Sequence, residues 1–235
     1  MRIFVQIAVC LWLAAPGLRA AEPITTLAEV LALSDEAALA GQSVRVEAVV
    51  LYADPVMEST IIHDGTAACY NGVYFGAVDP ASHPKIGDRV LFEATTKLLG
   101  VTPHIHSDHW TILGRGEIPE PHRLTPDEIY SPRLDPAWIE VQAVVVGVET
   151  GGIAYTLAVE VFGQTFKVDV PHSPDAAARA NALMQRPARM RAVLAAVYNQ
   201  HRQMIGRHFY VPSFDDIRPI APAADETGAP LLSVL

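Results

Sequence analysis

Alternating apolar and polar residues make up most of the chain from residue 43 to residue 217. Residues 44–50, for example, read VRVEAVV. This period of two is typical of a strand with one buried face. Asp64-Gly65-Thr66 separates two such runs, and Asp-Gly tolerates the positive φ values of a tight hairpin. The pattern predicts strands at residues 44–50, 59–63, 68–73, 88–96, 104–113, 138–148, 153–161, 164–170, 187–198 and 204–217.

The pattern also occurs twice along the chain. Residues 44–50 (VRVEAVV) match residues 139–145 (IEVQAVV), and the segments at 89–95 and 109–114 match those at 187–193 and 208–213. An offset of about 95–100 residues is the size of a small domain rather than of a solenoid repeat. Five strands with an intervening helix are the pattern of an OB-fold, a small Greek-key barrel. The sequence therefore predicts a mainly β protein with two tandem OB-fold-like five-stranded barrels and short accessory helices.

Helical periodicity is confined to short segments. Thr25 or Thr26 can cap a helix within residues 25–40, and Ser173 and Pro174 begin the pattern of another that runs to residue 184. Residues 114–136 contain five prolines, which disfavour regular strand pairing and indicate a stiff linker with a short helix near Thr125. The expected organisation is a helical segment at 21–42, a first barrel at 43–117, a linker at 118–136, a second barrel at 137–219 and a flexible tail at 220–235.

Residues 1–20 are read as a cleaved signal peptide rather than as part of the fold. Arg2 precedes an almost wholly apolar run from residue 3 to residue 15, and Ala20 is a suitable cleavage residue. The apolar run is shorter than the ~20 residues that span a bilayer. We therefore expect a periplasmic or secreted protein. Cys69 is then its only cysteine, which excludes an intrachain disulfide and favours a small buried side chain.

The overall charge argues against polyanions as partners. The formal net charge is −9 at pH 7, and exported acidic proteins are poorly suited to nucleic acid. A local basic patch in the last third of the second unit argues the other way, because cations and aromatic rings on an OB barrel can hold single-stranded nucleic acid. The patch consists of Arg186, Arg189, Arg191, His201, Arg202, Arg207 and His208, with Tyr198, Phe209 and Tyr210 between them.

A histidine cluster is the candidate metal site. It consists of His104, His106, Asp108 and His109. Alternate residues of a strand share a face, and neutral imidazole suits Zn²⁺ or Cu²⁺. A closed zinc site normally takes ligands from more than one element, so a solvated strand face is the simpler interpretation of this cluster.

The chain contains no recognisable catalytic motif and no cofactor fingerprint. We therefore expect neither an enzyme nor a cofactor. The candidate ligand contacts are the polar run that joins the last two strands, although asparagine and glutamine also serve turns well. This run is Tyr198, Asn199, Gln200, His201, Arg202 and Gln203.

Several segments together resemble a known family. They are residues 31–38 (LALSDEAA) with 44–50, 63–66 (HDGT), 86–90 (IGDRV), 112–121 (ILGRGEIPEP), 138–145 (WIEVQAVV), and 198–206 (YNQHRQMIG) with 209–213 (FYVPS). Over residues 25–235 the chain resembles the exported N-terminal sensory region of certain bacterial membrane histidine kinases and diguanylate cyclases. The resemblance implies a tandem OB-like module that senses a ligand outside the cytoplasm and has no enzymatic activity.

The sequence thus predicts an exported, non-catalytic module of sensory type that binds a small molecule or a protein. A membrane receptor is its expected partner, and nucleic acid is an unlikely one. Two alternatives remain open. One is a periplasmic metal-binding protein that uses the histidine cluster, and the other is an OB-fold binder of single-stranded nucleic acid.

Overall fold

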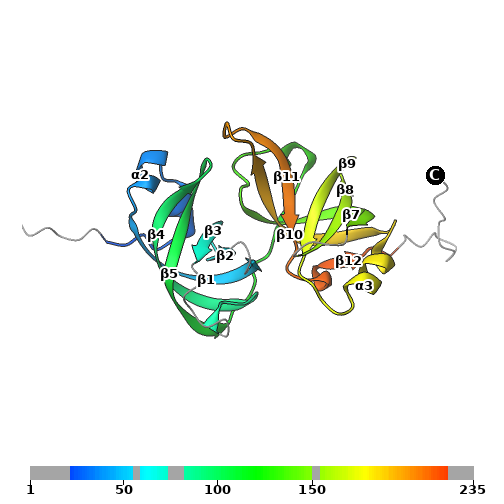
Figure 1. Cartoon of the computed structure of the whole chain (residues 1–235), viewed down its shortest axis with the longest axis horizontal. Helices are drawn as coiled ribbons and strands as arrows, with labels where there is room; N and C mark the ends of the chain where they lie inside the picture. The colour runs from blue at the N-terminus through cyan, green and yellow to red at the C-terminus, as the bar shows by residue number, and fades with distance from the viewer. Residues whose placement is uncertain (1–21, 55–58, 74–81, 150–153, 222–235) are drawn as a thin grey trace, which may run out of the picture.

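A computed structural model describes residues 22–54, 59–73, 82–149 and 154–221. The predicted signal peptide at residues 1–20 and nearly all of the predicted tail lie outside the described residues. Two β-barrels lie side by side, the first coloured blue to green and the second green to orange (Figure 1). No helix in the described ranges is long and apolar enough to cross a membrane.

The first barrel follows two short helices. These are α1 (Leu27–Leu31) and α2 (Asp35–Leu39), and the barrel strands are β1 (Ser43–Asp54), β2 (Ser59–His63), β3 (Ala68–Val73), β4 (Asp88–Leu99) and β5 (Thr102–Arg115). The strands close in the order β1-β2-β3-β5-β4, with β3 and β5 parallel and the other pairs antiparallel. Inward residues such as Val46, Phe92 and Ile105 form its core together with Leu27 and Val30 of α1.

The second barrel repeats this arrangement. Its strands are β7 (Ala137–Glu149), β8 (Tyr155–Val161), β9 (Gln164–Val170), β10 (Pro187–Tyr198) and β11 (Met204–Tyr210), and α3 (Ala176–Leu183) lies between β9 and β10. Pairing of β10 with β7 closes the barrel, and β9 with β11 is the parallel pair. Two barrels of five strands confirm the fold class predicted from the alternation and the repeat.

The structure corrects three boundaries. The last predicted strand ends at Tyr210, and a short helix η3 (Phe214–Asp216) and strand β12 (Ile217–Pro219) follow it. Helix α3 begins at Ala176 rather than after Ser173. The predicted linker contains η2 (Pro126–Glu128) and also β6 (His122–Arg123), which pairs in parallel with β7 despite the prolines around it.

The predicted linker is packed against the second barrel. Leu124 and Ile129 are buried in that barrel's core. The buried Arg207 of β11 donates hydrogen bonds to the carbonyl oxygens of Ile129, Ser131 and Leu134. A buried guanidinium needs such partners, so Arg207 fixes this segment and is unavailable to a ligand.

The two barrels share an apolar contact. Leu51, Tyr52, Ile61 and Ala68 of the first barrel form one buried cluster with Trp138 and Val193 of the second. The rings of Tyr52 and Tyr210 pack against each other across this contact at a tilt of 45°, with centroids 4.9 Å apart. The strand 2–3 face is the part of an OB-fold that commonly binds oligonucleotides. In the first barrel, residues of β2 and β3 on this face are covered by the second barrel.

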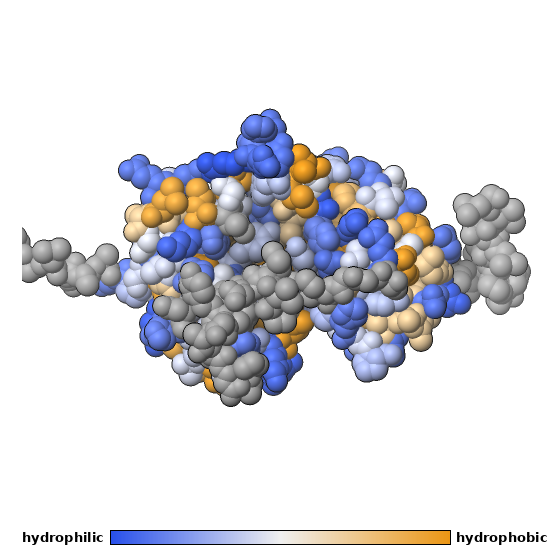
Figure 2. Space-filling model, in the orientation of Figure 1, coloured by the Kyte–Doolittle hydropathy of each residue, from blue (hydrophilic) through white to orange (hydrophobic). Residues whose placement is uncertain are grey.

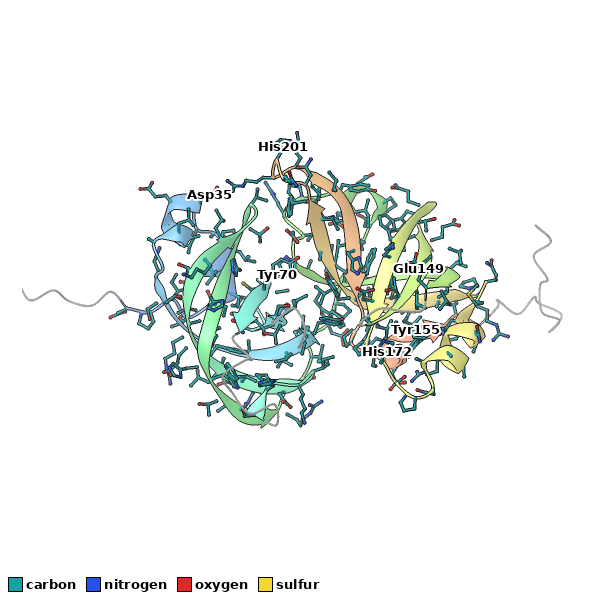
Figure 3. All side chains as sticks on the ribbon, in the orientation of Figure 1. Asp35, Tyr70, Glu149, Tyr155, His172 and His201 are labelled. Carbon is teal, nitrogen blue, oxygen red and sulfur yellow. The ribbon has the colours of Figure 1, made fainter. Side chains whose placement is uncertain are left out.

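Asp135 is the polar centre of the contact between the barrels. Its Oδ1 accepts hydrogen bonds from the Tyr70 hydroxyl at 2.7 Å and from the Ala196 amide at 2.8 Å. Its Oδ2 accepts from Thr102 at 2.8 Å and from the Tyr198 hydroxyl at 3.0 Å. Tyr70, labelled between the barrels in Figure 3, has a raised pKa because it is buried beside this carboxylate. One buried carboxylate therefore joins strands of both barrels.

Asp64 confirms the hairpin turn predicted at residues 64–66 and also caps α1. Its carboxylate accepts hydrogen bonds from the amides of Leu27 at 2.7 Å, Thr66 at 2.8 Å and Ala67 at 3.1 Å. Burial acts to raise the pKa of Asp64, but these bonds and the Thr66 hydroxyl outweigh it and hold the pKa below 3.8.

We expect Asp64→Ala to lower the free energy of unfolding at pH 7 by about 1–2 kcal/mol, as the loss of a cap does. Since the folded-state pKa is depressed, this contribution is present above the unfolded pKa and is lost as the pH falls through the folded pKa. Urea unfolding of the wild type and of Asp64→Ala should therefore give a constant difference in the free energy of unfolding down to about pH 4. Below that pH the difference should become smaller. A difference that does not change with pH would contradict the role given to the carboxylate.

Candidate functional site

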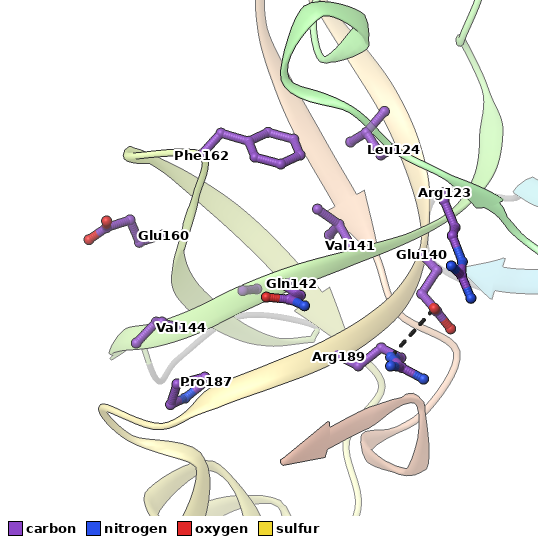
Figure 4. A pocket seen from close by; sticks show the side chains of 11 residues that line it. Arg123, Leu124, Glu140, Val141, Gln142, Val144, Glu160, Phe162, Pro187 and Arg189 are labelled. Atoms are coloured by element: carbon purple, nitrogen blue, oxygen red, sulfur yellow. Dashed lines mark ion pairs between the residues drawn. The ribbon is translucent and has the colours of Figure 1, made fainter. Parts of the chain in front are cut away.

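A groove of about 510 Å³ runs along the outer face of β7 in the second barrel. The tip of the β8–β9 hairpin borders one side of it and β10 the other (Figure 4). Val141, Leu124 and Phe162 supply apolar lining, whereas Arg123, Glu140 and Arg189 gather at one end. The groove thus combines an apolar floor with a charged end.

Strand register explains why arginines collect there. Arg123 of β6 and Arg191 of β10 are both register partners of Glu140, from opposite edges of β7. Arg189 is the partner of Gln142 on one side and of Arg218 of β12 on the other. All these side chains project from the outer face of one sheet, because alternate residues of a strand point the same way.

Glu140 is the carboxylate shared within this cluster, and its side chain is 11% exposed. Its Oε2 lies 3.1 Å from Nε of Arg191, and its Oε1 lies 3.5 Å from Nε of Arg189. Arg189 remains 55% exposed. Arg191 also lies 3.6 Å from the exposed carboxylate of Glu120, so Arg189 is the member of this pair that stays more open to solvent.

Phe162 is at the tip of the β8–β9 hairpin beside the groove. Its φ is +50° and that of Gly163 is +73°, as a tight two-residue turn requires. The Phe162 side chain is 38% exposed. In Figure 4 its ring extends from the hairpin toward Leu124 across the apolar part of the groove. A partly exposed ring of this kind can stack on a planar aromatic ligand.

The strand 2–3 face of the second barrel is less basic. Lys167 pairs with Glu149 at 3.0 Å, and Asp169 Oδ2 lies 2.9 Å from His208 Nε2. Burial acts to raise the pKa of Asp169, but hydrogen bonds from His208 and Thr156 lower it below its ordinary value. The positive charge therefore gathers on the β7–β10 side of the barrel.

The polar run predicted to contact a ligand forms the β10–β11 turn. The amides of His201 and Gln203 donate to Asn199 Oδ1 at 2.9 and 3.0 Å, and Asn199 Nδ2 donates to Gln203 Oε1 at 2.9 Å. Arg202 has a φ of +61° and pairs with Asp35 of α2 at 2.9 Å. Asp35 and His201 are labelled close together in Figure 3, where the turn approaches the first barrel.

The members of this run thus stabilise the turn and its contact with α2, and Tyr198 binds Asp135. Gln200 and His201 are exposed. In the space-filling view hydrophilic residues form the uppermost projection of the molecule, where Figure 1 places this turn (Figure 2). The proposed ligand role of Tyr198, Asn199, Gln200, His201, Arg202 and Gln203 stays a prediction.

The predicted metal cluster lies on the outer face of β5. A register shift between Glu93 and Ala94 puts His104, His106 and His109 opposite Lys97, Thr95 and Glu93 of β4, and the side chain of Asp108 lies outside the described residues. Burial lowers the pKa of His104. Within the described part of the chain, no three His, Cys, Asp or Glu side chains are grouped as metal ligands. The histidines therefore share a face without an observed ligand set.

The predicted basic patch divides into parts with different roles. Arg189 lines the groove and Arg191 lies beside it on β10. Arg207 is buried, Arg202 pairs with Asp35 of α2, and His208 pairs with Asp169. The sequence did not connect Arg123 and Arg218 with this patch, because their neighbours across the sheet are far away in the chain. The alternation of residues 187, 189 and 191 toward the outer face was the one feature of the sequence that indicated this surface.

Cys69 is buried, as expected from the sequence. Burial raises the pKa of its thiol to about 12. Thiolate is the reactive form, so Cys69 has no part in the site.

No protein-family model and no curated protein match the chain. Solved structures with a similar fold include fission yeast Pot1 with ssDNA (10% identity, 82% of this chain and 93% of that one, TM-score 0.32). They also include a replication protein A heterotrimer bound to ssDNA (11% identity, 77% of this chain and 48% of that one, TM-score 0.35). A third is a murine DNA-binding protein bound with dsDNA (10% identity, 77% of this chain and 99% of that one, TM-score 0.34).

These comparisons correct two predictions from the sequence. The solved structures of similar fold are DNA complexes and not sensory regions, which contradicts the predicted sensory ligand- or protein-binding module and the prediction that nucleic acid is an unlikely partner. Whole-chain charge was the reason for that exclusion, and the arginine cluster shows that local charge differs from it. At these identities the similarity concerns the fold, and the ligand of this chain is argued below from its own residues.

Proposed function

We propose that the second barrel binds single-stranded nucleic acid along the β7 groove. The observation that carries this proposal is that Arg123 and Arg189 line the groove on either side of Glu140, whose deeply placed carboxylate pairs with Arg189 and with the neighbouring Arg191. Guanidinium groups bind phosphate oxygens through two parallel hydrogen bonds. Arg189 and Arg191 are about 7 Å apart along β10, given the rise of a strand, and an extended backbone can present neighbouring phosphates at such a spacing.

The apolar part of the groove suits bases. Phe162 offers a ring on which a base can stack, and such stacking contributes about 1–3 kcal/mol per base regardless of sequence. Val141 and Leu124 lie in the same groove. A single-stranded nucleic acid with its phosphates on the arginines and a base against Phe162 would use both the charged end and the apolar part of the groove.

The net charge of −9 weakens the long-range attraction between the protein and a nucleic acid, but it does not abolish local contacts between arginines and phosphates. Charges separated by more than about 8 Å are largely screened at physiological ionic strength. Binding should therefore depend on the arginines of the groove and be tightest at low salt.

A salt series with labelled oligonucleotides tests the proposal. We expect the logarithm of the association constant to fall with the logarithm of salt concentration with a slope of about −2 to −3, since each phosphate contact on a single strand contributes about −0.7. Fluorescence anisotropy with single-stranded DNA, single-stranded RNA and a duplex of the same sequence would measure it.

Three outcomes are distinguishable. Salt-dependent binding that favours single strands and weakens in Phe162→Ala supports the proposal. Binding of a base-free polyanion equally well, with no effect of Phe162→Ala, would show a general anion site instead. No binding of any strand at low salt would overturn the proposal.

A further inference from the structure

A second hollow of about 250 Å³ adjoins the groove. Glu140 and Arg189 line both, so the two are continuous. Arg191, Asp216 and Arg218 line the second hollow alone. We call it the arginine niche.

Three strands build the arginine niche. Arg189 of β10 is the direct register partner of Arg218 of β12, and Arg191 follows on the same face of β10. Strand β12 is the outermost strand on this side of the sheet, and Pro219 and Ile220 also line the niche.

Positive charge is denser in the arginine niche than along the groove. Arg218 donates from Nε to the carbonyl oxygen of Asp215 at 3.1 Å, which fixes its side chain. In the described ranges Arg218 forms no ion pair within 4.0 Å. Burial raises the pKa of Asp216, although hydrogen bonds with Ser213 and the charges of Arg218 and Arg191 act to lower it.

We propose that the arginine niche binds the terminal phosphate monoester of the strand that lies in the groove, an inference that rests on the proposed function. An internal phosphodiester carries one negative charge, whereas a terminal phosphate carries about −1.5 to −2 at neutral pH and three acceptor oxygens. The three guanidinium groups of the niche, set against the carboxylates of Glu140 and Asp216, suit the terminal group better than a phosphodiester.

The test compares matched single-stranded oligonucleotides with a 5′-phosphate, with a 3′-phosphate and with hydroxyl groups at both ends. We expect one of the phosphorylated ends to raise the affinity about tenfold, equivalent to about 1.4 kcal/mol. The identity of the preferred end gives the direction of the strand in the groove.

Two variants separate the niche from the groove. Arg218→Gln changes only the niche, so it should remove the preference for the phosphorylated end and leave the unphosphorylated strand bound as before. Arg123→Gln changes only the groove, so it should weaken all three oligonucleotides by the same factor and keep the preference.

Equal affinity of the three oligonucleotides for the wild-type protein would overturn the inference and leave the proposed function standing. A preference that survives Arg218→Gln would also overturn it, because the terminal group would then bind elsewhere. If no oligonucleotide binds, the proposed function fails and this inference fails with it.

Discussion

Replacement of Asp135 with alanine is expected to lower the free energy of unfolding by about 3–5 kcal/mol, the range for removal of one partner from a buried charged network. The carboxylate is 5% exposed and accepts four hydrogen bonds from Tyr70, Thr102, Ala196 and Tyr198. Alanine would leave these donors facing a cavity too poor in acceptors to satisfy them. Buried donors without partners each cost about 1–3 kcal/mol.

Urea unfolding, followed by fluorescence and by circular dichroism, measures this effect. Asp135→Asn should cost less than Asp135→Ala, because an amide oxygen keeps one acceptor and the hydroxyls of Thr102 and Tyr198 can rotate to accept from the amide nitrogen. The matched control is Asp127→Ala, at an exposed position of η2, which should change the stability by less than about 0.5 kcal/mol. A loss below 1 kcal/mol for Asp135→Ala would mean that Asp135 is not the centre of the contact.

The Asp135 network also bears on how the barrels act together. The contact joins a buried apolar cluster to a fully bonded carboxylate, so the barrels are held in one relative orientation. A ligand that changes their relative angle, as a sensory mechanism would require, would have to separate Trp138 and Tyr70 from their partners. The second barrel covers part of the strand 2–3 face of the first barrel, so in our proposal the first barrel supports the second and the second binds.

The fold was predictable because its signal is local. Alternation in residues 44–50 and 139–145 defines the inward faces of β1 and β7, and Asp64-Gly65 defines a hairpin by its backbone preference alone. The two barrels follow from repeating that local pattern. The predicted boundaries were wrong where tertiary pairing overrides local preference. At β6, for example, two residues between prolines pair with β7.

The contacts between segments far apart in the sequence were not predictable. Asp135 stands in a proline-rich stretch that looked like a linker, and its partner Tyr70 is 65 residues away. Arg123 and Arg191 meet around Glu140 only because β6 and β10 pair with opposite edges of β7. Net charge was misleading for a related reason, since it averages acidic surface elsewhere with an arginine cluster on one face.

The double variant Arg123→Gln/Arg189→Gln is expected to weaken binding of a single-stranded oligonucleotide by about 100-fold at low salt. Each arginine should contribute about tenfold, since a hydrogen bond to a charged group is worth about 1.5–3 kcal/mol and a factor of ten corresponds to about 1.4 kcal/mol. The slope of the salt dependence should also become shallower by about 1.4, because two phosphate contacts are lost.

The fold should not suffer from these substitutions. Arg123 and Arg189 are exposed, and Glu140 keeps its partner Arg191 at 3.1 Å. Stability should therefore stay within about 0.5 kcal/mol of the wild type, so that a loss of binding reports on the groove itself.

Arg45→Gln is the matched control. Arg45 is 57% exposed and pairs with Glu93 at 3.6 Å on the first barrel, much as Arg189 is 55% exposed and pairs with Glu140 at 3.5 Å on the second. The two substitutions remove the same charge from similar surroundings, and they differ in whether the arginine lines the groove. Arg45→Gln should leave the affinity within about twofold, since only a distant surface charge changes. Equal losses in Arg45→Gln and Arg189→Gln would mean that overall charge governs binding and that the groove is not the site.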